Sequence, residues 1–91
     1  MSSAVAAKMA ELAARFAGQA KTYRQELSQA DAEGDRGLIR DRAHKLAGIA
    51  PMLGHAEIGA AALTLEEAIE DGSDYRDTLD RLDRCLAAVT A

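Results

Sequence analysis

The chain has 91 residues, of which 48% are apolar and only 3% aromatic, and its net charge at pH 7 is −4. This length fits one domain, the acidic balance argues against nucleic acid as a partner, and the single cysteine excludes an intramolecular disulfide. Alanine at 21 positions and leucine at 10 favour closely packed helices over a β-sheet. Since the sequence shows neither a membrane span nor a signal peptide, we expect a cytoplasmic, all-α protein with no membrane partner.

The first predicted helix covers residues 3–31. Its apolar residues recur at alternating steps of four and three, which places them on one stripe of the helix. The stripe consists of Val5, Met9, Leu12, Phe16, Tyr23, Leu27 and Ala30. Gly18 lies in the middle and is expected to weaken or bend the helix. The pattern leaves open whether the start of the stripe packs over one end of the domain or extends beyond it and mediates self-association.

Three further helices are predicted at 35–53, 56–71 and 74–90. Asp35 is the expected N-cap of the first of them, and Gly54 and Gly72 are expected to end the first and the second. The inward side of the helix at 56–71 holds Ile58, Ala62, Leu65 and Ile69, and that of the last helix holds Tyr75, Leu79, Leu82, Leu86 and Val89. Four amphipathic helices with short connections predict an antiparallel up-down-up-down four-helix bundle that spans residues 1–91 as a single domain.

The helix at 35–53 carries the first candidate for chemistry. Its apolar face, projected at 3.6 residues per turn, contains Ile39, Leu46, Ile49, Ala50 and Leu53. His44 points directly away from this face, and Ala47 and Gly48 lie on its own side, so the imidazole is expected to rise from a low, accessible surface. Arg42 fits the projection poorly and is expected at a helix edge, paired or extended outward. An exposed histidine alone is most often a solvated surface residue, so this pattern does not by itself establish a site.

Glu66 is the expected neighbour of His44. His44 lies 10 residues before Gly54 and Glu66 lies 12 after it, which puts the two at ~15 and ~18 Å from the turn on antiparallel helices. A carboxylate at this place would fix one imidazole nitrogen by a hydrogen bond and leave the other as an exposed lone pair, as an oriented nucleophile requires. The alternative is a solvated glutamate, since the same helix also holds Glu67 and Glu70.

These residues belong to a longer pattern. Residues 43–54 read Ala-His-Lys-Leu-Ala-Gly-Ile-Ala-Pro-Met-Leu-Gly, and Ile58, Ala62 and the pair Leu65-Glu66 follow. In the histidine-containing phosphotransfer (HPt) domain the pattern runs Ala-His-x-Leu-Lys-Gly, then a stretch of small residues, a Leu-Gly pair and a later Leu-Glu or similar pair. The sequence resembles this family over nearly its whole length, because Arg15-Phe16 also look like its N-terminal segment.

The resemblance implies roles for individual positions. His44 matches the phosphoacceptor, which in the family takes a phosphoryl group reversibly on the ring nitrogen remote from the backbone. Glu66 matches the residue that hydrogen-bonds and orients this imidazole. Gly48 matches the small residue one turn on, which leaves room for a receiver domain, and the expected docking surface consists of Ala47, Gly48 and Met52.

Two positions depart from the family pattern. A lysine usually lies three residues after the histidine, beside the phosphoryl oxygens, and this chain has Ala47 there. Arg40, one turn before His44, or Lys45 would then supply the phosphate environment. Pro51 stands where the family has a small residue, and because proline removes a helical hydrogen bond, a bend is expected one turn past His44.

The expected function is that of a phosphorelay intermediate, in which His44 carries a phosphoryl group between aspartates of response-regulator receiver domains, with a hybrid histidine kinase as a further partner. No glycine-rich nucleotide loop is present, so we expect no kinase activity and no cofactor, with Mg²⁺ bound only on the receiver. The alternative is a degenerate HPt-like adaptor that docks on a receiver or kinase domain without carrying phosphate.

A metal site is disfavoured because His44 and His55 are the only histidines, whereas di-iron bundles use two inward Glu-x-x-His motifs. We expect His55 at the surface near a helix start, and Cys85 as a small, partly buried packing residue.

Overall fold

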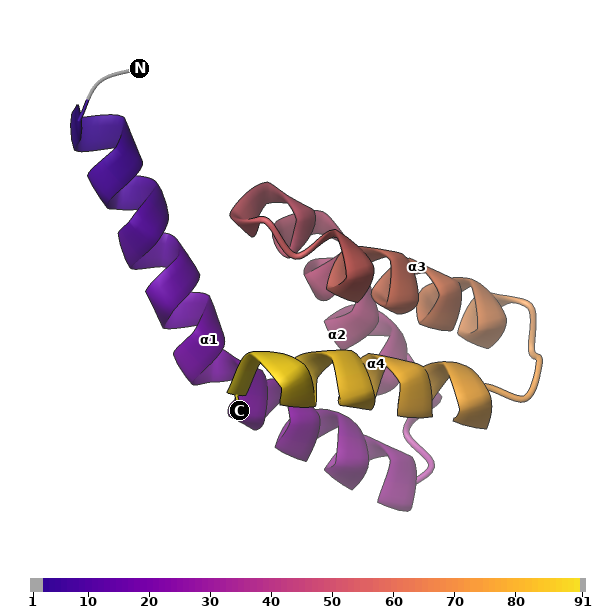
Figure 1. Cartoon of the computed structure of the whole chain (residues 1–91). Helices are drawn as coiled ribbons and strands as arrows, with labels where there is room; N and C mark the ends of the chain where they lie inside the picture. The colour runs from indigo at the N-terminus through magenta and orange to yellow at the C-terminus, as the bar shows by residue number, and fades with distance from the viewer. Residues whose placement is uncertain (1–2, 91) are drawn as a thin grey trace.

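The computed structural model describes residues 3–90, and this part of the chain contains four α-helices and no strand. The helices are α1 (Ser3–Ala32), α2 (Arg36–Ile49), α3 (Ala56–Glu70) and α4 (Arg76–Thr90), and a 3₁₀ turn, η1 (Pro51–Leu53), joins α2 to α3. Consecutive helices run in opposite directions (Figure 1). The predicted all-α, up-down-up-down bundle is therefore confirmed. None of the described helices is both long and apolar enough to cross a membrane.

The residues at the helix ends explain where the helices begin and end. The Asp35 carboxylate accepts a hydrogen bond from the Leu38 backbone N–H at 3.0 Å, so Asp35 is the N-cap of α2, as predicted. Gly54 has a φ of 87°, a left-handed conformation that costs glycine no steric strain, and it ends η1. The last helix begins at Arg76, two residues later than predicted, after Asp74 has accepted a hydrogen bond from the Arg76 backbone.

The second helix is shorter than predicted: α2 ends at Ile49 and not at Leu53. Pro51 has no N–H with which to continue the helical hydrogen bonds, so the chain tightens into the turn η1, in which the Gly54 N–H donates to the Pro51 carbonyl. Pro51 also lies directly against Gly59 of α3, where an added methyl group would come within 2.7 Å of the proline Cδ and closer still to its Cγ. Proline and glycine thus fit each other where α2 and α3 meet.

The core is built from the apolar faces of all four helices. Its largest fully buried side chains are Phe16, Leu27, Ile39, Leu46, Leu65, Leu82 and Leu86. Cys85 is half-buried and packs against the edge of this core, as expected from the sequence.

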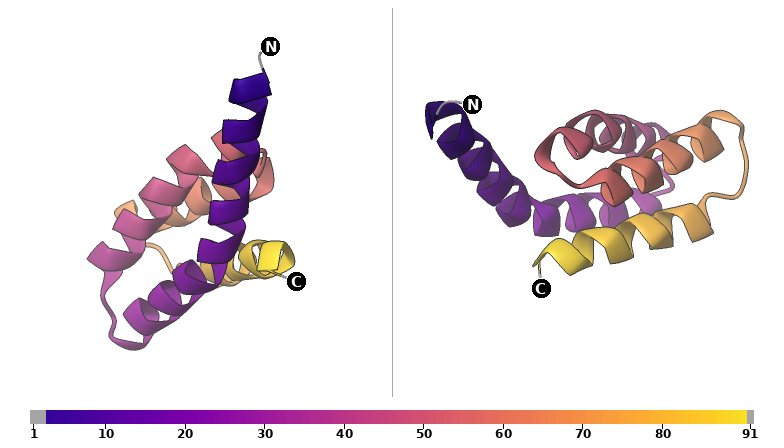
Figure 2. Two further views of the ribbon diagram at one scale, coloured as in Figure 1. Left: turned by 90° about the vertical axis from the view of Figure 1, so that its left-hand side faces the viewer. Right: turned by 45° about the horizontal axis from the view of Figure 1, so that its top comes forward.

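The N-terminal part of α1 extends beyond the core. It bends about halfway along, and its N-terminal part diverges from the other three helices (Figure 2). Phe16 is its first buried residue, residues 3–11 are all exposed, and Leu12 is half-buried. Of the two alternatives that the sequence left open, the start of the apolar stripe therefore extends beyond the bundle.

Candidate functional site

His44 and Glu66 form the most distinctive polar contact of the bundle. The His44 side chain projects from α2 with 74% of its surface exposed, and its Nδ1 lies 2.7 Å from Glu66 Oε2 on α3. Glu66 is only 8% exposed and is the one charged residue in the described core. Its neighbours in the chain explain the placement, because Leu65 and Ile69 face the core and Glu66 follows Leu65 by 100° around the helix. The edge of α3 therefore delivers a buried carboxylate to an exposed imidazole.

The contact fixes the protonation pattern of the ring. An ionised carboxylate can only accept a hydrogen bond, so at the 2.7 Å contact the ring proton lies on Nδ1. The other nitrogen, Nε2, then keeps its lone pair and is the ring atom available to an incoming electrophile. Within residues 3–90 Glu66 has no second hydrogen-bond partner, so its carboxylate serves this imidazole alone.

The surface beside His44 is low. Gly48 is exposed, and a methyl group added there would meet no other atom within 4 Å. Ala47 is half-buried, and Met52 of η1 is 72% exposed. Ala47 and Gly48 lie three and four residues after His44 and share its side of α2, so the surface next to the imidazole carries only small side chains there.

Leu63 of α3 is a further exposed apolar side chain, on the side of α3 that holds Glu66, and it was not predicted from the sequence. It is 49% exposed and lies three residues before Glu66 and four after Gly59, so it shares their side of α3. The signal was present in that spacing: once Glu66 is placed beside His44, a leucine one turn earlier must flank the same surface.

The two cations expected near the phosphate point elsewhere. Arg40 binds Glu70 (Nε to Oε1, 3.2 Å) and Asp41 (NH1 to Oδ1, 3.4 Å), and the Lys45 ammonium lies 6.0 Å from the centre of the Tyr23 ring. Neither side chain forms a hydrogen bond or an ion pair with the His44 ring, whose polar contact within residues 3–90 is with Glu66. Both side chains are exposed. Exposed ion pairs such as those of Arg40 contribute only ~0–1 kcal/mol, and an exposed cation–π contact such as that of Lys45 contributes ~0.5–1 kcal/mol, so either cation can exchange its partner at small cost.

Arg42 behaves as its projection indicated. It lies at the edge of α2 and pairs with Glu26 of α1, Nε to Oε2 at 3.1 Å.

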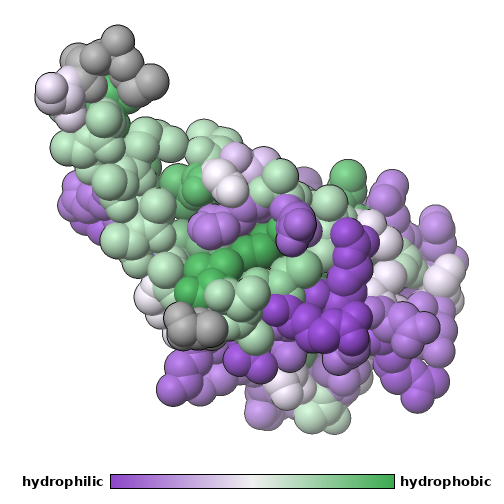
Figure 3. Space-filling view, viewed as in Figure 1, coloured by the Kyte–Doolittle hydropathy of each residue, from purple (hydrophilic) through white to green (hydrophobic). Residues whose placement is uncertain are grey.

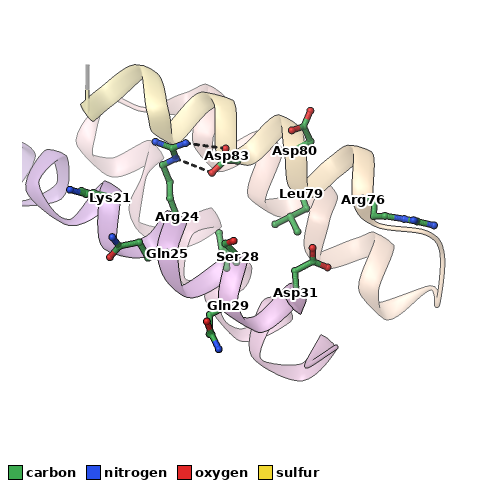
Figure 4. A pocket seen from close by; sticks show the side chains of 11 residues that line it. Lys21, Arg24, Gln25, Ser28, Gln29, Asp31, Arg76, Leu79, Asp80 and Asp83 are labelled. Carbon is green, nitrogen blue, oxygen red and sulfur yellow. Dashed lines mark hydrogen bonds and ion pairs between the residues drawn. The ribbon is translucent and has the colours of Figure 1, made fainter. Parts of the chain in front are cut away.

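A groove with a volume of about 770 Å³ lies on another side of the bundle, between α1 and α4 (Figure 4). Arg24 and Asp83 bridge it by two hydrogen bonds of 2.8 and 3.2 Å. None of its lining residues belongs to α2 or α3, so the groove does not communicate with His44. Within residues 3–90 no group of three or more histidine, cysteine or acidic side chains is arranged to hold a metal ion.

Comparison with known proteins gives one result. A family model described as the Hpt domain matches residues 11–91, which includes His44, Glu66 and the whole surface between them. No curated protein and no solved structure matches the chain.

Proposed function

The chain belongs to the Hpt domain family, whose members take part in histidine phosphotransfer in two-component signalling, and from this premise we propose that it is a phosphorelay carrier with His44 as its phosphoacceptor. The carrier takes a phosphoryl group from an aspartate of one receiver domain and passes it to an aspartate of another. The observation that carries the proposal is the 2.7 Å contact between an exposed imidazole and a buried carboxylate. Burying the Glu66 carboxylate costs free energy, and a histidine that is simply solvated at the surface would not explain why the fold bears that cost.

The chemistry of the step follows from the ring. The Nε2 lone pair of His44 attacks the phosphorus of the receiver's aspartyl phosphate, in line with the bond to the carboxylate oxygen. The N–P bond forms, the O–P bond breaks, and the aspartate leaves as a carboxylate, so no proton has to be transferred. The ring becomes positively charged in this step, and the Glu66 carboxylate at Nδ1 offsets that charge. Transfer to the second receiver is the same step reversed.

The chain supplies a nucleophile and a docking surface, and the receiver supplies the rest. We expect Mg²⁺ and the groups that bind the phosphoryl oxygens to come from the receiver, and the receiver to dock over Ala47, Gly48 and Met52. The remaining charge on the phosphoryl group would draw Arg40 or Lys45 towards it, because both lie on α2 near His44 and hold only weak surface contacts at present.

A degenerate adaptor is the second candidate, and one observation favours it. The family lysine is Ala47 here, and neither Arg40 nor Lys45 points at His44. A chain that docks on a receiver or a kinase domain without carrying phosphate would keep the small residues beside His44 and would not need a cation at this place.

A transfer experiment separates the two candidates. Several receiver domains, each carrying labelled phosphate on its aspartate, are mixed with the wild-type chain and with His44→Gln. A carrier takes up label that is stable to base and labile to acid, the variant takes up none, and ATP alone labels neither protein. If the receivers bind but no label moves to the wild type, the carrier proposal fails and the adaptor is the better account.

A further inference from the structure

The first 13 described residues of α1, 3–15, form an arm that stands outside the bundle (Figures 1 and 2). The family match begins at residue 11, so most of this arm precedes the segment shared with other Hpt domains. With the arm included, the radius of gyration is 13.7 Å, against about 12 Å for a compact domain of this length.

The arm is apolar over most of its circumference. It holds six alanines together with Val5, Met9 and Leu12, and its only charged residues are Lys8, Glu11 and Arg15. These three form one polar strip, in which Glu11 pairs with both Lys8 (3.7 Å) and Arg15 (3.1 Å). Figure 3 shows the arm as a mostly hydrophobic rod. A helix of this composition is normally covered by protein, yet Val5 and Met9 are 50% and 41% exposed.

The exposed stripe is continuous with the core. Val5, Met9 and Leu12 lie in line with Phe16, which is buried and stacks on His55 at 5.1 Å. From Phe16 onward the other helices cover this stripe, and before Phe16 the arm diverges from them and leaves an open angle above the end of the bundle. The apolar stripe thus continues along α1 both before and after Phe16, but the other helices of the same chain cover only the part after Phe16.

We infer that the arm is a dimerisation element, which pairs antiparallel with the arm of a second copy. A parallel pair along this stripe would bring both bundles into the same space, because each bundle lies on the stripe side of its own α1. In the antiparallel pair each arm enters the open angle of the other copy. Met9 then faces Leu12 of the second copy, and Val5 reaches the level of its Phe16. The pairing is isologous and closes at two copies.

Charge and size also fit a second copy. The arm carries a net charge of +1, which leaves −5 on residues 16–91, so the arm of one copy attracts the bundle of the other. The alanines let the two backbones approach closely, and the partner arm has the length of the face that it covers. An interface this small belongs to the weak end of specific interfaces.

The inference is tested by sedimentation of the full chain from micromolar to millimolar concentration. We expect the mass to rise from 9.6 kDa towards about twice that value. Met9→Glu places a charge in the interface and should weaken dimerisation at least about tenfold. Ala7→Glu puts the same charge on the opposite side of the arm and should leave it within about twofold. Circular dichroism checks that both variants keep their helices, and His44→Gln should dimerise like the wild type, since the inference does not depend on phosphotransfer.

The orientation is tested by a distance between two spin labels. With Cys85→Ser as background, a label at Ala4→Cys lies about 22 Å from its counterpart in the antiparallel pair and about 10 Å away in a parallel one. A chain that stays monomeric at millimolar concentration overturns the inference, and so does equal weakening by Ala7→Glu. A short distance keeps a dimer but overturns the antiparallel arrangement.

Discussion

The two histidines of the chain occupy opposite environments. His44 is 74% exposed and has one nitrogen fixed by a buried carboxylate. His55 lies at the start of α3, as expected, but the prediction that it lies at the surface was wrong: it is half-buried and stacks on Phe16, with ring centres 5.1 Å apart and planes 26° from parallel. Within residues 3–90 no hydrogen bond to the His55 ring is found. The more buried histidine is therefore a packing residue, and the more exposed one has the preferred tautomer that a nucleophile needs. What distinguishes a candidate site here is the partner of the ring and not its depth.

The test of this contrast with the largest expected effect replaces each of the two histidines separately by glutamine. His44→Gln should abolish transfer of label from a phosphorylated receiver, because no ring nitrogen remains to attack phosphorus. His55→Gln should transfer like the wild type and lose about 0.5–1.5 kcal/mol of stability with the lost stacking, measured by urea unfolding. Loss of transfer in the His55 variant while it remains folded would show that the two environments are not functionally distinct.

A second test acts on the distance between α2 and α3, which sets the contact of His44 with Glu66. Gly59→Ala forces a methyl group into the Pro51 ring and should lower the free energy of unfolding by about 1–3 kcal/mol. Gly18→Ala is the matched control, because a methyl group there meets nothing within 4 Å, and it should leave stability equal or up to about 1 kcal/mol higher. Equal stabilities for the two variants in urea would contradict the close fit of Pro51 and Gly59.

A third test keeps the hydrogen bond and removes its charge. In Glu66→Gln the amide oxygen can still accept from Nδ1, but it cannot offset the positive charge that the ring gains during transfer. We expect the transfer rate to fall about tenfold, while His44 is still labelled. Glu67→Gln, one residue on and exposed, should leave the rate unchanged. The role of Glu66 is refuted if both variants transfer at the wild-type rate.

The smallest expected effect concerns the hydrogen bond between Tyr75 and Asp31. It has the same length, 2.7 Å, as the contact between His44 and Glu66, but its acceptor Asp31 is exposed. The Tyr75 hydroxyl donates to Asp31 Oδ1 at 2.7 Å, and this bond, with a smaller contribution from burial, raises the pKa of Tyr75 above its ordinary value of 10.0. The bond stabilises the fold below the unfolded-state pKa, and its contribution is lost as the pH rises through the higher folded-state pKa. In a Tyr23→Phe background, absorbance at 295 nm should show this raised pKa, and Asp31→Asn should lower it. A titration that Asp31→Asn leaves unmoved would contradict the assignment.

Much of the fold could be predicted from the sequence because helical periodicity reports directly which residues face inward. The same projection placed His44 on the outside, and counting residues from Gly54 placed Glu66 beside it. The end of α2 was predicted wrongly, because the apolar pattern continues to Leu53 while Pro51 breaks the hydrogen bonding that the pattern assumes. The partners of Arg40 could not be predicted, since exposed ion pairs differ by fractions of a kcal/mol and the two acids that it contacts, Asp41 and Glu70, are both exposed.

Periodicity also could not decide the path of the arm. The stripe from Val5 to Leu12 indicates that a face is suited to packing, but the same pattern serves a neighbouring helix of the chain and a helix from another molecule. The structure shows that the bundle ends at Phe16, so that no helix within residues 3–90 covers Val5 or Met9.

Gly48 shows how the surface beside His44 relates to the stability of the molecule. It lies within α2, its φ is not positive, and a side chain there would meet no obstacle, so the fold has no need of glycine at this position. Alanine would favour the helix by about 0.5–1 kcal/mol. The bundle is thus less stable than its own architecture permits, and the stability that alanine would add is missing in the helical turn that follows His44. Under the proposed function, glycine at this position gives up some helix stability to keep the surface beside His44 small for a docking receiver.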